Sequence, residues 1–357
     1  MKRGLVVLDE AETSRRALGE RVERLQGVLE ERGVGAAFVY GDVYRSGDIT
    51  YLSNICIYWN EAVLAVPAKG SPALLTKLSK RVQTWMRASS SLDDLRSGPN
   101  LAKLCAEWLE GAGATGPVGL VEGGWWPGTL AAALGAELTG RELVDLGGAV
   151  RAERERPEAG EVALLRAGAE LSARSVAETL DGLASNDDRA GRAELISRSG
   201  GVEDVVVASH PAGPEGDVVE VVGEYRGYWT AAARVIARQQ ASWSEPMVAG
   251  YRAAGGALRH GVTTDGVRAA AAGGLAGAGV PWALEVLHHV DVETGGGYRL
   301  PGKGDAPFEA GAVAALRLRL ELPDGSSAVA SDTFLIGPTG AERLTAALPE
   351  AAVVAGS

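Results

Sequence analysis

The chain has 357 residues, 46% of them hydrophobic and 23% charged, a composition typical of a soluble globular protein with room for two domains. The formal net charge of −11 argues against general nucleic-acid binding, which requires a basic surface. No apolar run reaches the roughly 18 residues that a membrane span needs, and Leu5–Leu8 is too short for a signal peptide. Cys56 and Cys105 lie far apart, which predicts reduced core thiols in a cytoplasmic protein.

The first 150 or so residues alternate between helix-like and strand-like patterns. Residues 11–33 predict an amphipathic helix, because apolar residues recur at helical spacing and Gly33 stands at its end. Residues 101–112 predict another helix. Strand-like runs occupy residues 36–40, 62–67, 72–76 and 118–121. Such an alternation predicts an α/β domain.

A charged run at residues 151–157 separates this region from the rest of the chain. On composition alone it predicts a solvated helix start or a linker. A long helix follows at residues 161–180, with Val162, Leu165 and Ala169 on one face. The domain boundary is therefore expected near residue 155, giving domains of residues 1–154 and 155–357.

The second half of the chain combines strand pairs with two helices. Residues 205–209 predict a strand, and residues 216–234 predict a hairpin because two strand-like runs flank a short glycine-containing turn. Further along the chain the pattern predicts helices at 245–260 and 265–278, a strand-like run at 284–289 and a strand pair at 314–322 and 328–336. The fold class is thus α/β (α+β) in two domains.

The hairpin sequence GDVVEVVGEYRGYWTAAAR resembles one hairpin of the pita-bread fold, which methionine aminopeptidase, aminopeptidase P, prolidase and creatinase share. Tyr51–Asn54 and Gly340–Thr345 are also similar to segments of this family. The resemblance covers most of the chain. It implies a creatinase-like N-terminal domain over residues 1–154 and a pita-bread catalytic-type domain over residues 155–357.

The metal-dependent members of that family hold two divalent ions with two Asp, one His and two Glu. Aligned on the family motifs, these positions are occupied in this chain, in order, by Glu220, Ala231, either Pro281 or Trp282, Arg317 and Ser331. Alanine cannot bind a metal, and the other substitutions remove the donor set that a two-metal centre needs. The resemblance therefore implies a member that uses neither a metal nor another cofactor.

Creatinase is a metal-free member, and its hairpin is similar to Gly227–Arg234 here. It uses histidine as general acid and base, and the resemblance places catalytic histidines at His210 and His289, with His288 as a further candidate. Histidine suits this role because its pKa of about 6.5 allows proton transfer in both directions near neutral pH. The competing interpretation is that these histidines are structural, as His260 in its turn is expected to be.

Five residues are predicted to bind the substrate. A guanidinium is a planar cation suited to a carboxylate, so Arg317 would anchor an anionic, amino-acid-like molecule, assisted by Arg319 on the same strand face. Equally, Arg317 could form an ion pair with Glu220 inside a lost metal site. Trp282 would fill space that a metal used to occupy, and Glu220 and Tyr228 complete the predicted set.

Three functions remain open from the sequence. The first is a cofactor-free hydrolase or lyase that acts on a C–N bond of a small molecule. The second is a metal-free isomerase or cyclase of a specialised pathway, and the third is a non-catalytic binding module. The resemblance also implies a homodimer in which the N-terminal domain of one subunit lies near the site of the other.

Overall fold

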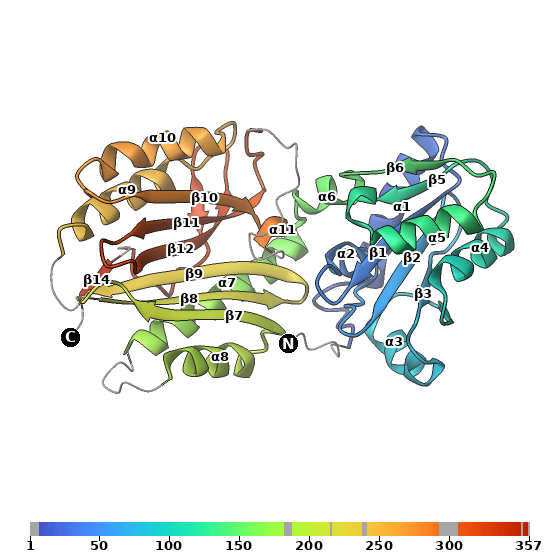
Figure 1. Cartoon of the computed structure of the whole chain (residues 1–357), viewed down its shortest axis with the longest axis horizontal. Helices are drawn as coiled ribbons and strands as arrows, with labels where there is room; N and C mark the ends of the chain where they lie inside the picture. Colours follow the sequence, from blue (N-terminus) through green and yellow to red (C-terminus); the bar gives the residue numbers. More distant parts are fainter. Residues whose placement is uncertain are drawn as a thin grey trace. The chain divides into compact units, whose positions relative to one another are not determined.

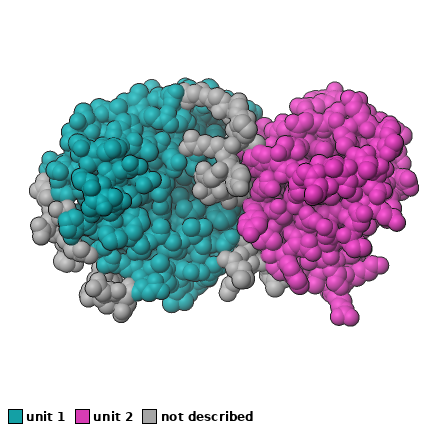
Figure 2. All heavy atoms as spheres, in the orientation of Figure 1, with its two compact units in different colours: residues 1, 155–357 teal, residues 2–154 magenta. Residues whose placement is uncertain are grey.

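The computed structural model describes residues 7–181, 188–214, 216–237, 241–292, 306–350 and 353–355. The chain forms two compact units, one of residues 2–154 and the other of residues 155–357 (Figure 2). No helix in these described ranges is long and apolar enough to cross a bilayer.

The N-terminal unit is built on a mixed sheet with the strand order β4-β3-β2-β1-β5-β6. Its strands are β1 (Ala36–Asp42), β2 (Glu61–Pro67), β3 (Ala73–Thr76), β4 (Asp94–Ser97), β5 (Val118–Val121) and β6 (Leu143–Asp145). Its helices are α1 (Arg15–Glu31), α2 (Gly47–Ser53), α3 (Gln83–Ser89), α4 (Leu101–Ala112), α5 (Gly128–Glu137) and α6 (Ala149–Arg154), with 3₁₀ turns η1 (Lys80–Val82) and η2 (Gly123–Trp125).

Side-chain alternation along β1 builds a core on both faces of this sheet. Ala37 and Val39 join one apolar cluster and Ala36 and Phe38 join the other, because successive side chains on a strand point to opposite faces. Helices cover both faces (Figure 1). The predicted α/β character is confirmed.

The charged run at the end of this unit is less solvated than its composition predicts. It forms α6, but Arg151 and Arg154 are both buried. Arg154 Nη1 lies 2.8 Å from Asp48 Oδ1. Buried charges are usually paired, so this segment contributes to packing and is not a purely solvated linker.

The C-terminal unit contains a second sheet with the order β10-β11-β12-β9-β8-β7. Its strands are β7 (Asp204–Pro211), β8 (Gly216–Tyr225), β9 (Tyr228–Ala237), β10 (Trp282–His288), β11 (Val313–Glu321) and β12 (Ser327–Ile336), with β13 (Ala341–Arg343) beside β12 and β14 (Val353–Ala355) beside β9. Its helices are α7 (Ala159–Asp181), α8 (Arg189–Ser199), α9 (Ser244–Ala257), α10 (Thr264–Leu275) and α11 (His289–Val292).

The predicted hairpin at residues 216–234 is present as β8 and β9. The loop between them consists of Arg226 and Gly227, which have φ values of 53° and 85°. Two loop residues with positive φ are typical of the type I′ turn, whose twist matches that of paired strands. Glycine adopts this conformation without steric cost.

Helices pack against one face of each half of the sheet (Figure 1). Leu316 and Leu318 of β11 share a core with α9 and α10, and Val219 and Val221 of β8 share a core with α7. Since strand side chains alternate, Arg317 on β11 must face away from these helices. Glu220 on β8 does so too. The face of the sheet opposite the helices therefore carries the side chains of Arg317 and Glu220.

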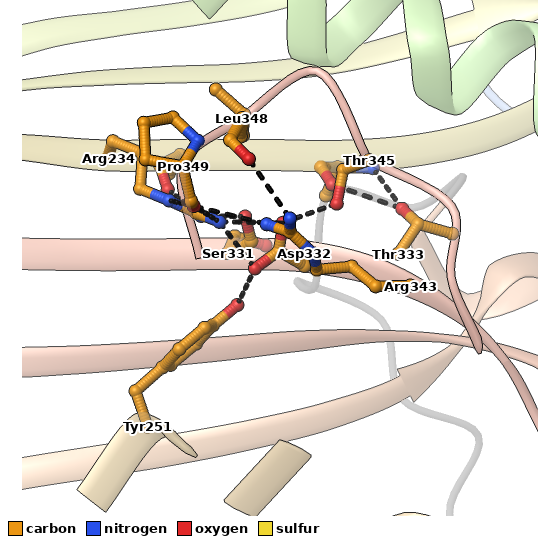
Figure 3. A network of polar contacts seen from close by, with 11 residues as sticks. Arg234, Tyr251, Ser331, Asp332, Thr333, Arg343, Thr345, Leu348 and Pro349 are labelled. Atoms are coloured by element: carbon orange, nitrogen blue, oxygen red, sulfur yellow. Dashed lines mark hydrogen bonds and ion pairs between the residues drawn. The ribbon is translucent and has the colours of Figure 1, made fainter. Parts of the chain in front are cut away.

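A buried network ties the segment after β12 to the sheet (Figure 3). Arg234 Nη2 donates to both carboxylate oxygens of Asp332, at 2.9 and 2.8 Å, and also to the Pro349 carbonyl at 2.8 Å. The Tyr251 hydroxyl donates to Asp332 Oδ2 at 2.8 Å, and the Thr345 hydroxyl donates to Asp332 Oδ1. Arg234 is fully buried and Asp332 is 1% exposed, so both charges depend on these contacts.

Candidate functional site

Strand register brings distant charged residues into one row across the second sheet. Glu285 of β10 pairs with Arg317 of β11, and Arg317 pairs with Ser331 of β12. Ser331 then pairs with Ala233 of β9, which pairs with Glu220 of β8. Residues opposite one another on paired strands project to the same side of a sheet. This row is the centre of the candidate site.

Arg317 is bound by both carboxylates of the row. Its Nε donates to Glu220 Oε1 at 2.5 Å and its Nη2 donates to Glu220 Oε2 at 3.0 Å, a bidentate arrangement. Its Nη1 lies 3.5 Å from Glu285 Oε2. The hydrogen bond that Arg317 donates to Glu220 raises the pKa of Arg317 above its ordinary value. Of the two roles left open by the sequence, the ion pair with Glu220 is the one observed.

A cavity of about 350 Å³ adjoins this row. Its charged lining residues are the two glutamates and Arg317, so the described lining carries two carboxylates and one guanidinium. The remaining walls are mainly apolar and are formed by Val206, Val222, Trp229, Ala231, Leu287, Val292 and Ala315, with Ser331 beside Arg317. Apolar walls with a few polar groups are typical of a small-molecule site.

None of the three candidate histidines is among the described residues that line this cavity. His288 follows Leu287 on β10 and therefore points to the opposite face, where its ring centroid lies 5.0 Å from that of Phe308. His289 begins α11, is 2% exposed and lies 6.2 Å from the Tyr228 ring. The expectation that they face the Arg317 cavity is not supported.

His210 lies on the correct sheet face but beyond the charged row. Ala208 pairs with Glu220 and Val206 with Val222, and the cavity extends from the row toward Val206. His210 lies two residues in the other direction, and its Nδ1 is 3.0 Å from the Pro211 carbonyl oxygen. The spacing of histidines in the sequence could not reveal on which side of the row each would fall.

The other three predicted substrate-binding residues, like the histidines, are not among the described residues that line the cavity. Trp282 pairs with Leu320 and packs against the core beneath α9 and α10, so the expectation that it fills the former metal space is wrong. Arg319 shares the face of Arg317, but its side chain is 46% exposed and lies 3.8 Å from Glu321. Tyr228 is buried, and its hydroxyl donates to Glu161 at 2.7 Å, which makes it structural.

The residues present do not fit a two-metal centre. Within the described part of the chain, no group of three or more His, Cys, Asp or Glu is placed to hold a metal ion. The two carboxylates of the row flank a guanidinium, and Ala231 lines the cavity where the resemblance places a metal-binding Asp. A fixed cation thus lies between the acidic groups of this site.

Three cavity residues with polar groups, Glu285, Ser331 and Trp229, were not in the predicted substrate-binding set. Glu285 and Ser331 line the cavity because β10 and β12 pair with β11 on either side of Arg317. Trp229 lies two residues before Ala231 on the same face of β9, so the alternation of the hairpin was the available signal.

Comparisons with known proteins agree with this architecture. Residues 21–156 match the family described as the creatinase/prolidase N-terminal domain. A comparison with curated protein sequences gives no match.

Among solved structures, the X-Pro aminopeptidase from Thermotoga maritima is similar with a TM-score of 0.79 and 16% identity, over 94% of this chain and 99% of that one. The Xaa-Pro dipeptidase from Bacillus anthracis has a TM-score of 0.75 and 16% identity, over 94% and 100%. The dipeptidase PepE from Mycobacterium ulcerans has a TM-score of 0.71 and 21% identity, over 96% and 99%.

The chain therefore has a creatinase/prolidase N-terminal domain followed by a C-terminal domain of the pita-bread fold. The resemblance to the creatinase, aminopeptidase P and prolidase family is confirmed at the level of fold. Identities of this size establish the fold, and the activity has to be argued from the site.

Proposed function

We propose that this chain is a metal-independent hydrolase that cleaves a C–N bond of a small molecule bound beside Arg317. The observation that carries the proposal is the row of Glu220, Arg317 and Glu285 at the edge of an apolar cavity. The fold is that of enzymes named for cleaving X-Pro bonds, and the row supplies a positive charge held in place by acidic partners.

Each charged residue has a chemical role in this proposal. Arg317, fixed by Glu220, would stabilise the negative charge that develops on the carbonyl oxygen when water attacks its carbon. Glu285 would accept a proton from that water and deliver it to the departing nitrogen as the C–N bond breaks. The products are a carboxylic acid and an amine, so the step consumes one water and needs no oxidant or cofactor.

Histidine acid–base chemistry is not part of the proposal, because the described histidines lie outside the cavity. The same observation favours a second candidate, a binding domain that has lost catalysis along with its metal ligands. An isomerase or cyclase, the remaining alternative from the sequence, would convert its substrate without a change in mass.

The test is a hydrolysis screen with X-Pro dipeptides, amino-acid amides and creatine, analysed by mass spectrometry before and after dialysis against EDTA. The expected result is cleavage that survives EDTA and falls at least about 100-fold in Glu285→Gln, the size of a typical general-base contribution. Arg319→Met, outside the cavity, should retain activity. Cleavage that requires added manganese would contradict the metal-independent mechanism, and intact substrates throughout would favour the binding domain.

We further propose a cytoplasmic homodimer in which the N-terminal domain of one subunit lies near the site of the other, following the family resemblance. Light scattering after gel filtration should then give about twice the chain mass of 36.8 kDa. A monomer mass would refute this arrangement.

A further inference from the structure

Two residues of the cavity wall carry a buried polar atom without a partner. Trp229 Nε1 and Ser331 Oγ have no hydrogen-bond partner among the described residues, although the two residues are only 5% and 0% exposed. Both residues line the cavity. Buried polar atoms are nearly always hydrogen-bonded in folded proteins, so these two groups indicate a polar ligand atom. An indole N–H can only donate, which requires an acceptor.

The two groups lie at different ends of the apolar wall. Trp229 belongs to a cluster with Ala231, Val292 and Ala315, whereas Ser331 pairs with Arg317 in the charged row. Trp229 is four residues from the row along β9, about 13 Å at the rise of a β-strand. A ligand that reaches both must be larger than a single polar group, and a cavity of about 350 Å³ can hold a small molecule with an apolar body.

The charges of the row restrict the charge that the polar end of a bound ligand can carry. The described lining holds two carboxylates and one guanidinium, and Glu220 already binds Arg317 in the bidentate manner that a ligand carboxylate would use. An anionic ligand would have to displace Glu220 while facing Glu285. The anionic substrate that the sequence favours is thus disfavoured by the structure.

We propose that the cavity binds a small apolar molecule that has an acceptor oxygen and no negative charge. A carbonyl or amide oxygen of such a ligand accepts a hydrogen bond from Trp229 Nε1–H or from Ser331 Oγ–H, and a ligand with two such oxygens can engage both groups. Its uncharged or cationic end lies beside Glu285. This inference rests on the cavity of the proposed function and specifies its ligand class.

Three probes with the same apolar body separate the charge classes: L-leucinamide is cationic, N-acetyl-L-leucinamide is neutral and N-acetyl-L-leucine is anionic. Binding to the full chain is measured by calorimetry. The two amides should bind at least about tenfold more tightly than the anion. Equal or tighter binding of N-acetyl-L-leucine, or no binding of any probe at millimolar concentration, would overturn the proposal.

Variants then test the two hydrogen-bonding groups. Trp229→Phe and Ser331→Ala should each weaken N-acetyl-L-leucinamide binding about five- to tenfold, while the matched variants Trp282→Phe and Ser327→Ala, outside the cavity, should not. Without ligand, Trp229→Phe should not lower the melting temperature more than Trp282→Phe, because it removes a donor without a partner. Weakening by the control variants as large as by the cavity variants would refute the assignment.

The outcomes also separate this inference from the proposed function. Amide binding without any C–N cleavage supports the ligand class and refutes the hydrolase. Cleavage with an equal preference for N-acetyl-L-leucine supports the hydrolase and refutes the ligand class.

Discussion

Arg317 stands where the family resemblance places a carboxylate ligand of a metal ion. Its guanidinium donates hydrogen bonds to Glu220 and lies near Glu285, so its positive charge neutralises part of the negative charge of the site. The side chains of Arg317 and Glu220 are 30% and 10% exposed, which leaves the pair only partly screened by water. Arg317 is therefore the centre of an ion-pair network with two glutamates.

Replacing Arg317 alone should therefore destabilise the protein more than replacing both Arg317 and Glu220. Arg317→Met leaves two carboxylates without their cation and should lower the free energy of unfolding by about 1–3 kcal/mol. The double variant Arg317→Met/Glu220→Met should recover most of this loss, as measured by urea denaturation in a double-mutant cycle. Arg319→Met, with a side chain 46% exposed, is the control. Equal losses in Arg317→Met and Arg319→Met would contradict the network.

The two cysteines should differ in reactivity. Burial raises the pKa of the Cys105 thiol to about 12, whereas Cys56 is only partly buried. The thiolate is the reactive form, so Cys105 should resist iodoacetamide in the native protein. Mass spectrometry should find Cys56 alkylated first and Cys105 only after unfolding. Early labelling of Cys105 would show that this part of α4 opens readily.

At the scale of secondary-structure elements, Asp332 joins β12 to β9, to α9 and to the segment beyond β13. It accepts hydrogen bonds from Arg234, Tyr251 and Thr345 (Figure 3). Burial, and then the negative charge of Asp332, raises the pKa of Tyr251 well above its ordinary value, so this hydroxyl remains a donor across the physiological range. These contacts compensate the burial of both charges.

Asp332→Asn should destabilise the C-terminal unit by about 3–5 kcal/mol, because it leaves the buried Arg234 charge without its counter-ion. Thermal denaturation measures the loss. Tyr251→Phe removes a single donor and should cost about 1–2 kcal/mol. Asp324→Asn, at an exposed position between β11 and β12, should change little. A loss no larger in Asp332→Asn than in Asp324→Asn would exclude a stabilising role for the network.

Glu122 makes the stability of the N-terminal unit depend on pH. Burial raises its pKa, with additional repulsion from Asp48 and Asp145, although its Oε1 accepts the Gly148 N–H at 2.7 Å. Its folded pKa thus exceeds its unfolded value. Ionising the partly buried Glu122 lowers the free energy of unfolding. This loss is absent below the unfolded pKa of Glu122 and grows as the pH rises through its folded pKa.

Glu122→Gln should therefore stabilise the protein at about pH 7.5 and bring no such gain at about pH 4, since glutamine keeps the acceptor oxygen without the charge. Urea denaturation at both pH values measures the difference. Glu110→Gln, at an exposed position of α4, is the control, and its effect on stability should be the same at both pH values. A gain that is the same at both pH values would mean that the charge of Glu122 is not its cause.

On the scale of the whole molecule, the chain consists of two units with separate cores. Residues 2–154 form a six-stranded sheet covered by its own helices, and the second sheet lies entirely within residues 155–357. A domain with its own core can in principle fold alone. Residues 2–154 expressed separately should unfold cooperatively, as followed by circular dichroism. A non-cooperative transition, compared with that of the full chain, would show that this unit depends on the rest.

The sequence by itself determined the local elements and the family resemblance. Apolar spacing predicted α1, the glycine-containing turn predicted the β8–β9 hairpin, and the motif order predicted the fold that the structural comparisons confirm. These features depend on residues close together in the chain, where periodicity and turn chemistry act directly.

Only the tertiary structure decided what the site contains. Glu220 and Arg317 are 97 positions apart, and their contact depends on the register of four strands, β8, β9, β12 and β11. Alternate side chains of a strand lie on opposite faces, so His288 and Trp282 lie away from the cavity while Leu287 lines it. A shift of one residue in the strand register would reverse these positions. Register is set by long-range pairing, and residue spacing along the chain does not encode it alone.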